Sequence, residues 1–310
     1  MLSYLAQRFL TLIIVMIVVT MIIFGLMHAV PGGPFSQTQQ PLPAFAMRNI
    51  EVKYGLNQPI WLQYLKWVWA ALHGDFGIPF EEPTETVTQL ISKAWPVTLA
   101  VGAWTIVISY VGGIALGLIS AIRQNTWIDW VLTSFATTGI ALPNYVVGFL
   151  LIVVFAVTLG WLPTGGWGQP QDLILPVIAF ALNPMALCAR YTRASALEVT
   201  HADYVQMGRA RGLSEWRINL NYVLRTALIP LITILGPNIP NLLTGSIFIE
   251  ATFALPGLGS YFTTAILRRD YPMIMCLVLI VAVLWGTCYI LSDVAYTLVD
   301  PRIRLAGASR

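Results

Sequence analysis

Long apolar stretches constrain this chain more than any other feature of its sequence. A helix needs about 20 largely apolar residues to cross the hydrocarbon core of a bilayer, and about six stretches reach that length. The predicted spans are Phe9–Val30, Val97–Ala121, Val131–Leu159, Leu173–Ala189, Leu228–Phe253 and Met273–Val299. Only 10% of the 310 residues are charged, whereas soluble domains carry about 25%. The sequence therefore predicts an all-α integral membrane protein surrounded mainly by lipid.

The arginines are distributed unevenly between the two sides of these spans. One side holds Arg8, Arg123, the arginines between residues 190 and 225, and those of the tail, while the short connections on the other side hold only Arg268 and Arg269. Because arginine-rich loops stay in the cytoplasm, both termini are predicted to be cytoplasmic. The first apolar stretch exceeds a signal-peptide core of about 7–15 residues and lacks a small-residue cleavage site, so we expect it to be retained.

Four regions follow from these spans. Residues 1–30 form the first transmembrane helix, 31–96 an extracytoplasmic segment, 97–300 a core of five transmembrane helices, and 301–310 a cytoplasmic tail. Within the extracytoplasmic segment, apolar side chains recur at helical spacing over Trp61–Leu72 and Thr84–Ala94, which predicts two helices. The first is aromatic and weakly charged, which suits the membrane interface. A cap over the bundle and a docking surface for an external partner are both open, and the two are compatible.

Small and helix-breaking residues shape the predicted spans. Ser109, Gly113 and Gly117 form a ridge at a spacing of four, which lets another helix approach closely. The prolines of Pro143-Asn144, Pro184, and Pro237 with Pro240 are predicted to interrupt later spans. Such breaks are tolerated at membrane depth where neighbours or water satisfy the backbone.

The fifth predicted span also carries a polar face. It is formed by Asn238, Asn241, Thr244 and Ser246. A polar face on a broken helix can line a translocation path, and it can equally make ordinary hydrogen bonds between helices. Both interpretations are open.

Three carboxylates lie within or beside apolar spans. A charge at membrane depth costs about 2.5–3.5 kcal/mol on insertion scales, so each needs an explanation. Glu250 lies near the outer end of the fifth span, where the interface lowers this cost. For Asp293 and Asp300 we favour structural ion pairing over a role in proton transport.

One polar stretch, Asp203–Leu224, predicts two short helices joined at an elbow. Asp203 and Ser214 are predicted to cap the two helices, with Gly212 as the left-handed residue between them. An amphipathic elbow below a membrane bundle suits docking onto a soluble partner. Gly212 is the predicted pivot of this loop. The residues predicted to dock on the partner are Tyr204, Val205, Met207, Arg209, Arg211, Leu213 and Trp216. Gly208, Ala210 and Ser214 complete the predicted coupling segment.

The sequence indicates no active site. It contains none of the patterns G-x-x-x-x-G-K-[ST], H-E-x-x-H or G-x-S-x-G. Its three histidines and three cysteines are scattered without zinc or disulfide spacing, so no metal site is expected. A net charge of +3 with scattered arginines argues against nucleic acid as a partner.

Several motifs, in this order, resemble one known family. They are Tyr54-Gly55-Leu56, Asp203-Tyr204-Val205 with Arg209-Ala210-Arg211-Gly212-Leu213-Ser214, Leu224–Pro230, Pro256-Gly257-Leu258-Gly259, Arg269-Asp270-Tyr271-Pro272 and Asp300-Pro301-Arg302. Over essentially its whole length, the chain resembles permease subunits of ATP-binding-cassette (ABC) importers of the peptide and nickel uptake family. It is closest in pattern to the first permease of bacterial oligopeptide importers. Gly208 stands where the family loop commonly has Ala, and Arg225 where the broader importer loop has Pro.

The resemblance implies a type I ABC importer permease with its elbow as the coupling helix, in the bacterial plasma (inner) membrane. It implies a homologous second permease, two ABC ATPase subunits that hold ATP and Mg, and an extracytoplasmic peptide-binding protein. This chain would then be no enzyme and would bind no cofactor. The expected cargo is oligopeptide, with dipeptides, nickel or another small solute as alternatives. An ion-gradient secondary transporter is the alternative from another class.

Overall fold

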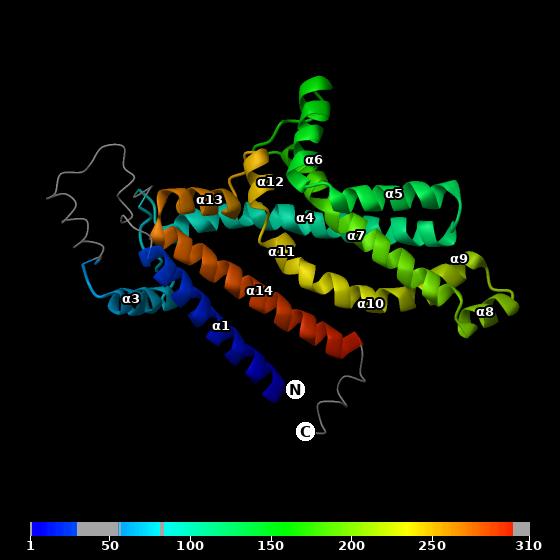
Figure 1. The fold of residues 1–310 in the computed structure, drawn as a ribbon, viewed down its shortest axis with the longest axis horizontal. Coiled ribbons are helices and arrows are strands. Elements are labelled where there is room, and N and C mark those ends of the chain that lie inside the picture. Colours follow the sequence, from blue (N-terminus) through cyan, green and yellow to red (C-terminus); the bar gives the residue numbers. More distant parts are fainter. Residues whose placement is uncertain (1, 30–54, 56, 81–83, 300–310) are drawn as a thin grey trace. The chain divides into compact units, whose positions relative to one another are not determined.

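The computed structural model describes residues 2–29, 55, 57–80 and 84–299. Every regular element in these residues is a helix, which confirms the all-α prediction for this part of the chain (Figure 1). The chain divides into two compact units, the first made of Met1–Val97 and Pro256–Ile290 and the second of Thr98–Leu255 and Leu291–Arg310. Most of the predicted extracytoplasmic segment before Gly55, the tail 301–310 and Asp300 lie outside the described residues.

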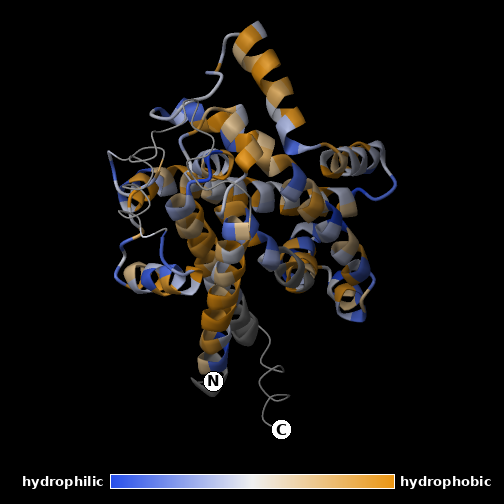
Figure 2. Cartoon of the chain, turned by 60° about the vertical axis from the view of Figure 1, so that its left-hand side comes forward, coloured by the Kyte–Doolittle hydropathy of each residue, from blue (hydrophilic) through white to orange (hydrophobic). Residues whose placement is uncertain are grey.

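The first unit is built on two long apolar helices, α1 (Leu2–Ala29) and α14 (Tyr271–Val299). Figure 2 shows apolar residues along most of α1, and large side chains such as Phe9, Ile14 and Ile22 are more than half exposed, as lipid-facing residues are. Helix α3 (Ile60–Leu72) is tied to α1 by a 3.0 Å hydrogen bond between the Thr20 and Tyr64 hydroxyls.

The buried core of the first unit comes from three helices. The start of α4 (Val87–Ile122) packs against α13 (Leu258–Arg268) and the first turns of α14. The buried side chains of this core are Val87, Leu90, Ile91, Ala94, Leu258, Ala265, Met273, Ile274, Cys276 and Leu277. The predicted short helix Thr84–Ala94 is therefore mostly the buried first part of α4, which continues without interruption into the predicted second span.

The second unit is arranged around α7 (Ile174–Thr200), which packs against α5, α6 and α10. The elements before it are α5 (Trp127–Ala141), α6 (Asn144–Leu151), the π-helical turn η1 (Ile152–Thr158) and the 3₁₀ turn η2 (Pro170–Leu173). Those after it are α8 (Asp203–Ala210), α9 (Glu215–Ile218), η3 (Asn219–Leu224), α10 (Arg225–Leu235), η4 (Gly236–Asn238), α11 (Ile239–Leu243) and α12 (Ile247–Thr252).

Four helices of the described chain are long and apolar enough to cross a membrane, or five if one bent pair is a single span. The bent pair is α5 and the continuous stretch of α6 and η1, which turn by 108° at Leu142-Pro143. Proline lacks an N–H and disfavours helical backbone at the preceding residue, so the break predicted there is confirmed.

The predicted fifth span is broken more than expected. It consists of α10, η4, α11 and α12, and none of these is long enough to cross a membrane alone. One break follows Gly236-Pro237, as predicted, and a second falls at Gly245, whose φ of +78° suits glycine. The interruption predicted at Pro184 is wrong, because α7 continues through that residue.

The ridge of small residues in α4 lies directly against α7, as predicted. A Cβ added at Gly113 would lie 2.6 Å from Cβ of Cys188, and one at Gly117 would lie 2.4 Å from the carbonyl oxygen of Ala189. Real Cβ atoms do not approach backbone this closely, so the two helices are in contact through their main chains. Ser109, one turn earlier, is fully buried.

We predict that Gly117→Ala destabilises the protein although alanine favours helices by about 1 kcal/mol over glycine. The methyl group would collide with the α7 backbone, which cannot move aside as a flexible side chain can. The matched control is Gly25→Ala in α1, where a Cβ would meet no described heavy atom within 4 Å. Thermal unfolding in detergent should show a lower midpoint for Gly117→Ala only, and an equal response of both variants would contradict the packing.

Candidate functional site

The elbow consists of α8 and α9 joined by a four-residue turn. Gly212 has φ +75°, which confirms its predicted left-handed conformation, and the amide of Leu213 donates to the Gly208 carbonyl at 3.2 Å. Ser214 is at the N-cap position of α9 as predicted, although its side chain makes no capping bond. The predicted cap at Asp203 is wrong: Ala202 precedes α8, and Asp203 lies in its first turn, where the helix dipole favours a carboxylate.

The inner face of the elbow is anchored in an apolar core. Val205 and Ile218 are fully buried there with Ala196 of α7 and Leu118 of α4. Val205 was expected on the docking surface and instead faces inward, because it lies on the apolar side of α8. Gly208 is also buried, between Leu213 and Ile218.

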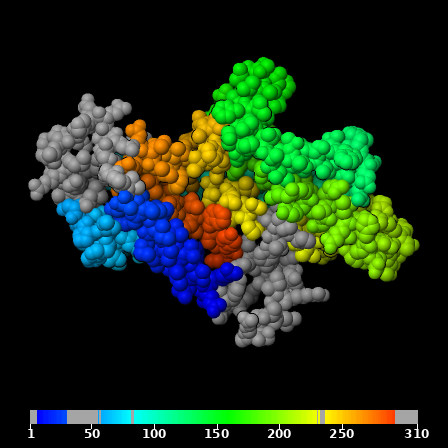
Figure 3. Space-filling model, in the orientation of Figure 1, coloured from blue at the N-terminus to red at the C-terminus, as the bar shows by residue number. Residues whose placement is uncertain are grey.

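The outer face of the elbow exposes large side chains to the surroundings. Tyr204, Met207 and Trp216 are 42%, 53% and 71% exposed. The Arg209 guanidinium pairs with the Glu215 carboxylate at 2.9 Å and so ties α8 to α9. Figure 3 shows the elbow as yellow-green atoms at the end of the second unit. Exposed aromatic, methionine and arginine side chains are typical of protein–protein interfaces.

A second candidate feature is a cavity of about 360 Å³ beside the bend between α5 and α6. Asn238 and Asn241, two of the predicted path residues, line it together with Asn144 and Asn183. The amide of Asn183 also donates to the Ile140 carbonyl at 3.1 Å, which satisfies a backbone acceptor freed where α5 ends. The pattern of asparagines near prolines could have indicated this cavity from the sequence.

The other two predicted path residues do not line this cavity. The Thr244 hydroxyl, directly after α11, donates to the Pro240 carbonyl of that helix at 3.0 Å. Ser246 caps α12 by accepting from the Ile249 amide at 3.4 Å. Both side chains therefore bond the local backbone.

Glu250 is buried beside the break at Gly245. It is 1% exposed and accepts a hydrogen bond of 2.9 Å from the Thr98 hydroxyl. A Cβ at Gly245 would lie 2.6 Å from its Oε1 atom, so the backbone passes directly over the carboxylate. These contacts hold the Glu250 side chain between Thr98 and the backbone of Gly245. Asp293 lies in α14, while Asp300 lies outside the described residues.

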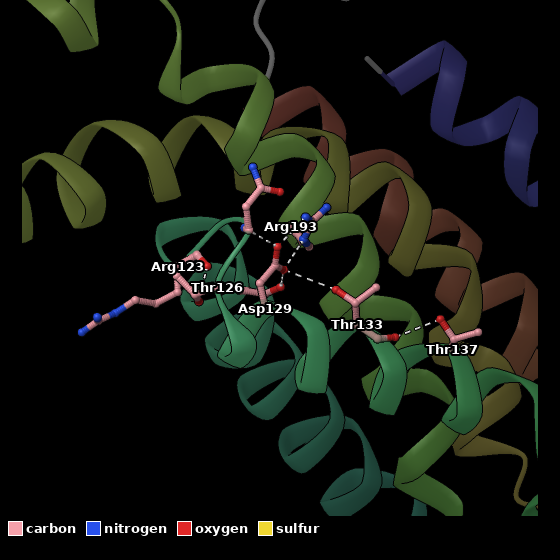
Figure 4. Close-up of polar contacts among 8 residues, drawn as sticks. Arg123, Thr126, Asp129, Thr133, Thr137 and Arg193 are labelled. Carbon is pink, nitrogen blue, oxygen red and sulfur yellow. Dashed lines mark hydrogen bonds and ion pairs between the residues drawn. The ribbon is translucent and has the colours of Figure 1, made fainter.

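An ion pair between a buried carboxylate and a partly exposed arginine near the elbow was missed by the sequence reasoning. Arg193 of α7 forks onto Asp129 of α5, with Nε–Oδ1 and Nη2–Oδ2 distances of 2.7 and 2.9 Å. Figure 4 shows the Asp129 carboxylate at the centre of a group of polar side chains. Arg193 was counted only for its charge, and a lone aspartate 64 positions away gives no pattern that joins the two. Among the described residues, no group of three or more His, Cys, Asp or Glu could hold a metal ion.

Comparison with known proteins identifies the family. Residues 113–305 match the model of the "Binding-protein-dependent transport system inner membrane component", and residues 1–102 match "Binding-prot-dependent transport system membrane comp, N-term". The chain belongs to this family of transport-system membrane components. The expected resemblance is thereby confirmed, and the chain is a multi-pass membrane protein.

Named relatives of this membrane component cover nearly the whole chain. The dipeptide transport system permease protein DppB of Bacillus subtilis is 38% identical over 302 residues, 97% of this chain and 98% of the relative. The oligopeptide transport system permease protein OppB of Salmonella typhimurium is also 38% identical, over 98% of this chain and 100% of the relative.

Solved structures confirm the fold of the membrane component. A chain of the inward-facing MetNI methionine ABC transporter aligns with a TM-score of 0.58 at 18% identity, covering 68% of this chain and 97% of that chain. An amino acid ABC transporter aligns with a TM-score of 0.52 at 18% identity, covering 67% and 92%. The type I importer permease fold expected from the sequence is therefore confirmed.

We predict that Gly212→Ala destabilises the elbow of this membrane component by about 1–2 kcal/mol, the usual cost of a left-handed non-glycine residue. A Cβ at Gly212 would meet no described heavy atom within 4 Å, so only backbone strain acts. Gly208→Ala is the control, because its Cβ would make ordinary contacts of 3.7 Å or more. Amide hydrogen exchange over residues 203–218 should accelerate in Gly212→Ala and not in Gly208→Ala. Equal protection in both variants would contradict the role of the turn.

Proposed function

We propose that this chain is the membrane-spanning permease subunit of an ATP-driven importer of oligopeptides. The observation that carries the proposal is the elbow, whose inner face is anchored on α4 and α7 while its outer face presents Tyr204, Met207 and Trp216. An elbow whose inner face is fixed to the helix bundle and whose outer face is apolar suits a partner that binds it and moves it. The names of the relatives supply the cargo class.

The partners follow from the family. We infer a homologous second permease that shares the translocation path, and two cytoplasmic ABC ATPases that dock on the elbows. ATP and Mg would be held by the ATPases, so this chain would be no enzyme and would carry no cofactor. The family description, a binding-protein-dependent transport system, supports an extracytoplasmic peptide-binding protein. Both termini would lie in the cytoplasm, because the predicted spans put most arginines, those of the elbow included, on the same side as the termini, and arginine-rich loops stay in the cytoplasm.

The route from the elbow to the cargo would run along α7. This helix is unbroken from Ile174 to Thr200, and at 1.5 Å per residue about 25 Å separate Asn183 from its last turn. Because α7 carries both a wall of the asparagine cavity and the anchor of the elbow, movement of the elbow would reach the cavity. Switching between inward and outward access would then be a rigid tilt of packed helices.

Asparagine side chains suit the handling of peptides of varied sequence. Each amide offers donors and an acceptor, which match the repeating C=O and N–H groups of a peptide backbone. We propose that Asn238 and Asn241, with Asn144 and Asn183, contact the cargo backbone in the path. Thr244 and Ser246 are left out of this lining because their hydroxyls bond the local backbone.

Dipeptide import is the second candidate function, because the dipeptide and oligopeptide permeases are equally similar to this chain. The assembled complex in proteoliposomes, with its binding protein, should take up radiolabelled pentapeptide only when ATP is supplied. Competition by unlabelled dipeptides and pentapeptides would then separate the two cargo classes. Uptake driven by an ion gradient without the ATPases would contradict the proposal.

For the docking surface, we predict that Trp216→Ala weakens retention of the ATPases by about 2–4 kcal/mol, as expected for an aromatic interface hot spot. Trp216 is exposed, so the fold should persist. The control is Trp161→Ala, with similar exposure of 68% but on the connection between η1 and η2. Co-purification of the ATPases at increasing salt measures the effect. Equal retention by both variants would place the docking surface elsewhere.

A further inference from the structure

The Asp129 carboxylate accepts hydrogen bonds from three separate parts of the second unit. Besides the fork from Arg193 of α7, it accepts from the Ser120 hydroxyl of α4 and from the Asn125 amide in the α4–α5 turn, the latter at 3.0 Å. The Thr133 hydroxyl on its own helix donates at 3.3 Å. Asp129 is 4% exposed, so this carboxylate is a buried centre that joins α4, α5 and α7.

The same turns of α4 and α7 hold the elbow. Ser120 lies between Leu118 and Ala121, which belong to the apolar core around Val205. Arg193 precedes Ala196 of that core by three residues, which is close to one helical turn. The Asp129 centre and the elbow anchor are therefore neighbouring layers on the same two helices.

Helix α5 leads from this centre to the asparagine cavity. Asp129 is in its first turn, and Ile140 and Ala141 at its other end line the cavity. At 1.5 Å per residue these positions are about 17 Å apart along a continuous helix. A displacement of Asp129 along this axis therefore displaces the cavity wall.

We propose that Asp129 and Arg193 form a positioning pair that makes α5 move together with α7 when the elbow is pushed. The proposal rests on the function proposed above, and it assigns the pair a part in coupling rather than in docking or cargo binding. A bidentate arginine–carboxylate contact fixes both distance and direction. Apolar side chains at this junction could slide past one another, whereas the fork would have to break.

The test is the number of peptide molecules transported per ATP hydrolysed by the complete complex in proteoliposomes. Asp129→Asn and Arg193→Gln should each lower this ratio by about tenfold, within the usual range of coupling between sites, while ATP hydrolysis continues. The double variant should be no worse than either single variant, since both remove the same contact. The control is Lys93→Gln, which removes an exposed ion pair of 2.6 Å with Glu85 in the first unit and should leave the ratio unchanged.

A merely structural role gives a different result. The amount of assembled complex, transport and ATP hydrolysis would then fall in parallel while the ratio of transport to hydrolysis stays unchanged. This outcome overturns the proposal, and so do effects of the two substitutions that multiply in the double variant.

Ser120→Ala is the milder variant should the charge variants fail to assemble, because it removes one bond to Asp129 and leaves the ion pair. It should lower the ratio measurably, and an unchanged ratio overturns the proposal. Failure of the proposed function is distinguishable, because the native chain would then show no ATP-dependent uptake.

Discussion

The close approach of α4 and α7 is the contact on which the second unit depends. Between helices in lipid there is little hydrophobic driving force, so association relies on van der Waals packing and on small residues that let backbones meet. Gly113 and Gly117, about one turn apart on α4, supply this approach. The same alignment brings Ser120 within hydrogen-bonding reach of Asp129 and brings Leu118 into the core of the elbow. Packing, polar centre and elbow are thus consequences of one helix pair.

Two helix breaks in this chain occur where the freed backbone groups find partners. At the end of α5, the Ile140 carbonyl accepts from Asn183, and Ser246 supplies the cap that α12 needs after Gly245. Unsatisfied backbone groups are costly in a membrane, so such breaks are restricted to protein-lined or wet places. The asparagine cavity lies beside one of these breaks, which gives the bend and the polar lining a common physical cause.

The sequence predicted the helical class, the ridge of small residues and the left-handed Gly212, because each depends on local composition or spacing. It failed where tertiary packing decides. Pro184 does not end α7, which packs along its length against α5, α6 and α10. Val205 could not be placed on the inner face of α8 from a stretch of only eight helical residues, because too few turns define the apolar side. The second break of the predicted fifth span depends on the contact of Gly245 with Glu250 and Thr98, which is not visible in local sequence.

A comparison of two ion pairs in the second unit shows why burial matters more than sequence signal. Arg209 and Glu215 are six residues apart in a stretch already recognised as polar, yet both are exposed, and such pairs contribute about 0–1 kcal/mol because solvent screens them. Asp129 and Arg193 have no local signature, yet the carboxylate is buried and fully surrounded by donors. The Arg193 side chain is 29% exposed, so solvent moderates the cost, but loss of Arg193 would leave the buried Asp129 carboxylate without its opposite charge. A directional contact between α5 and α7 is what the helix bundle needs if movement of the elbow is to reach the asparagine cavity.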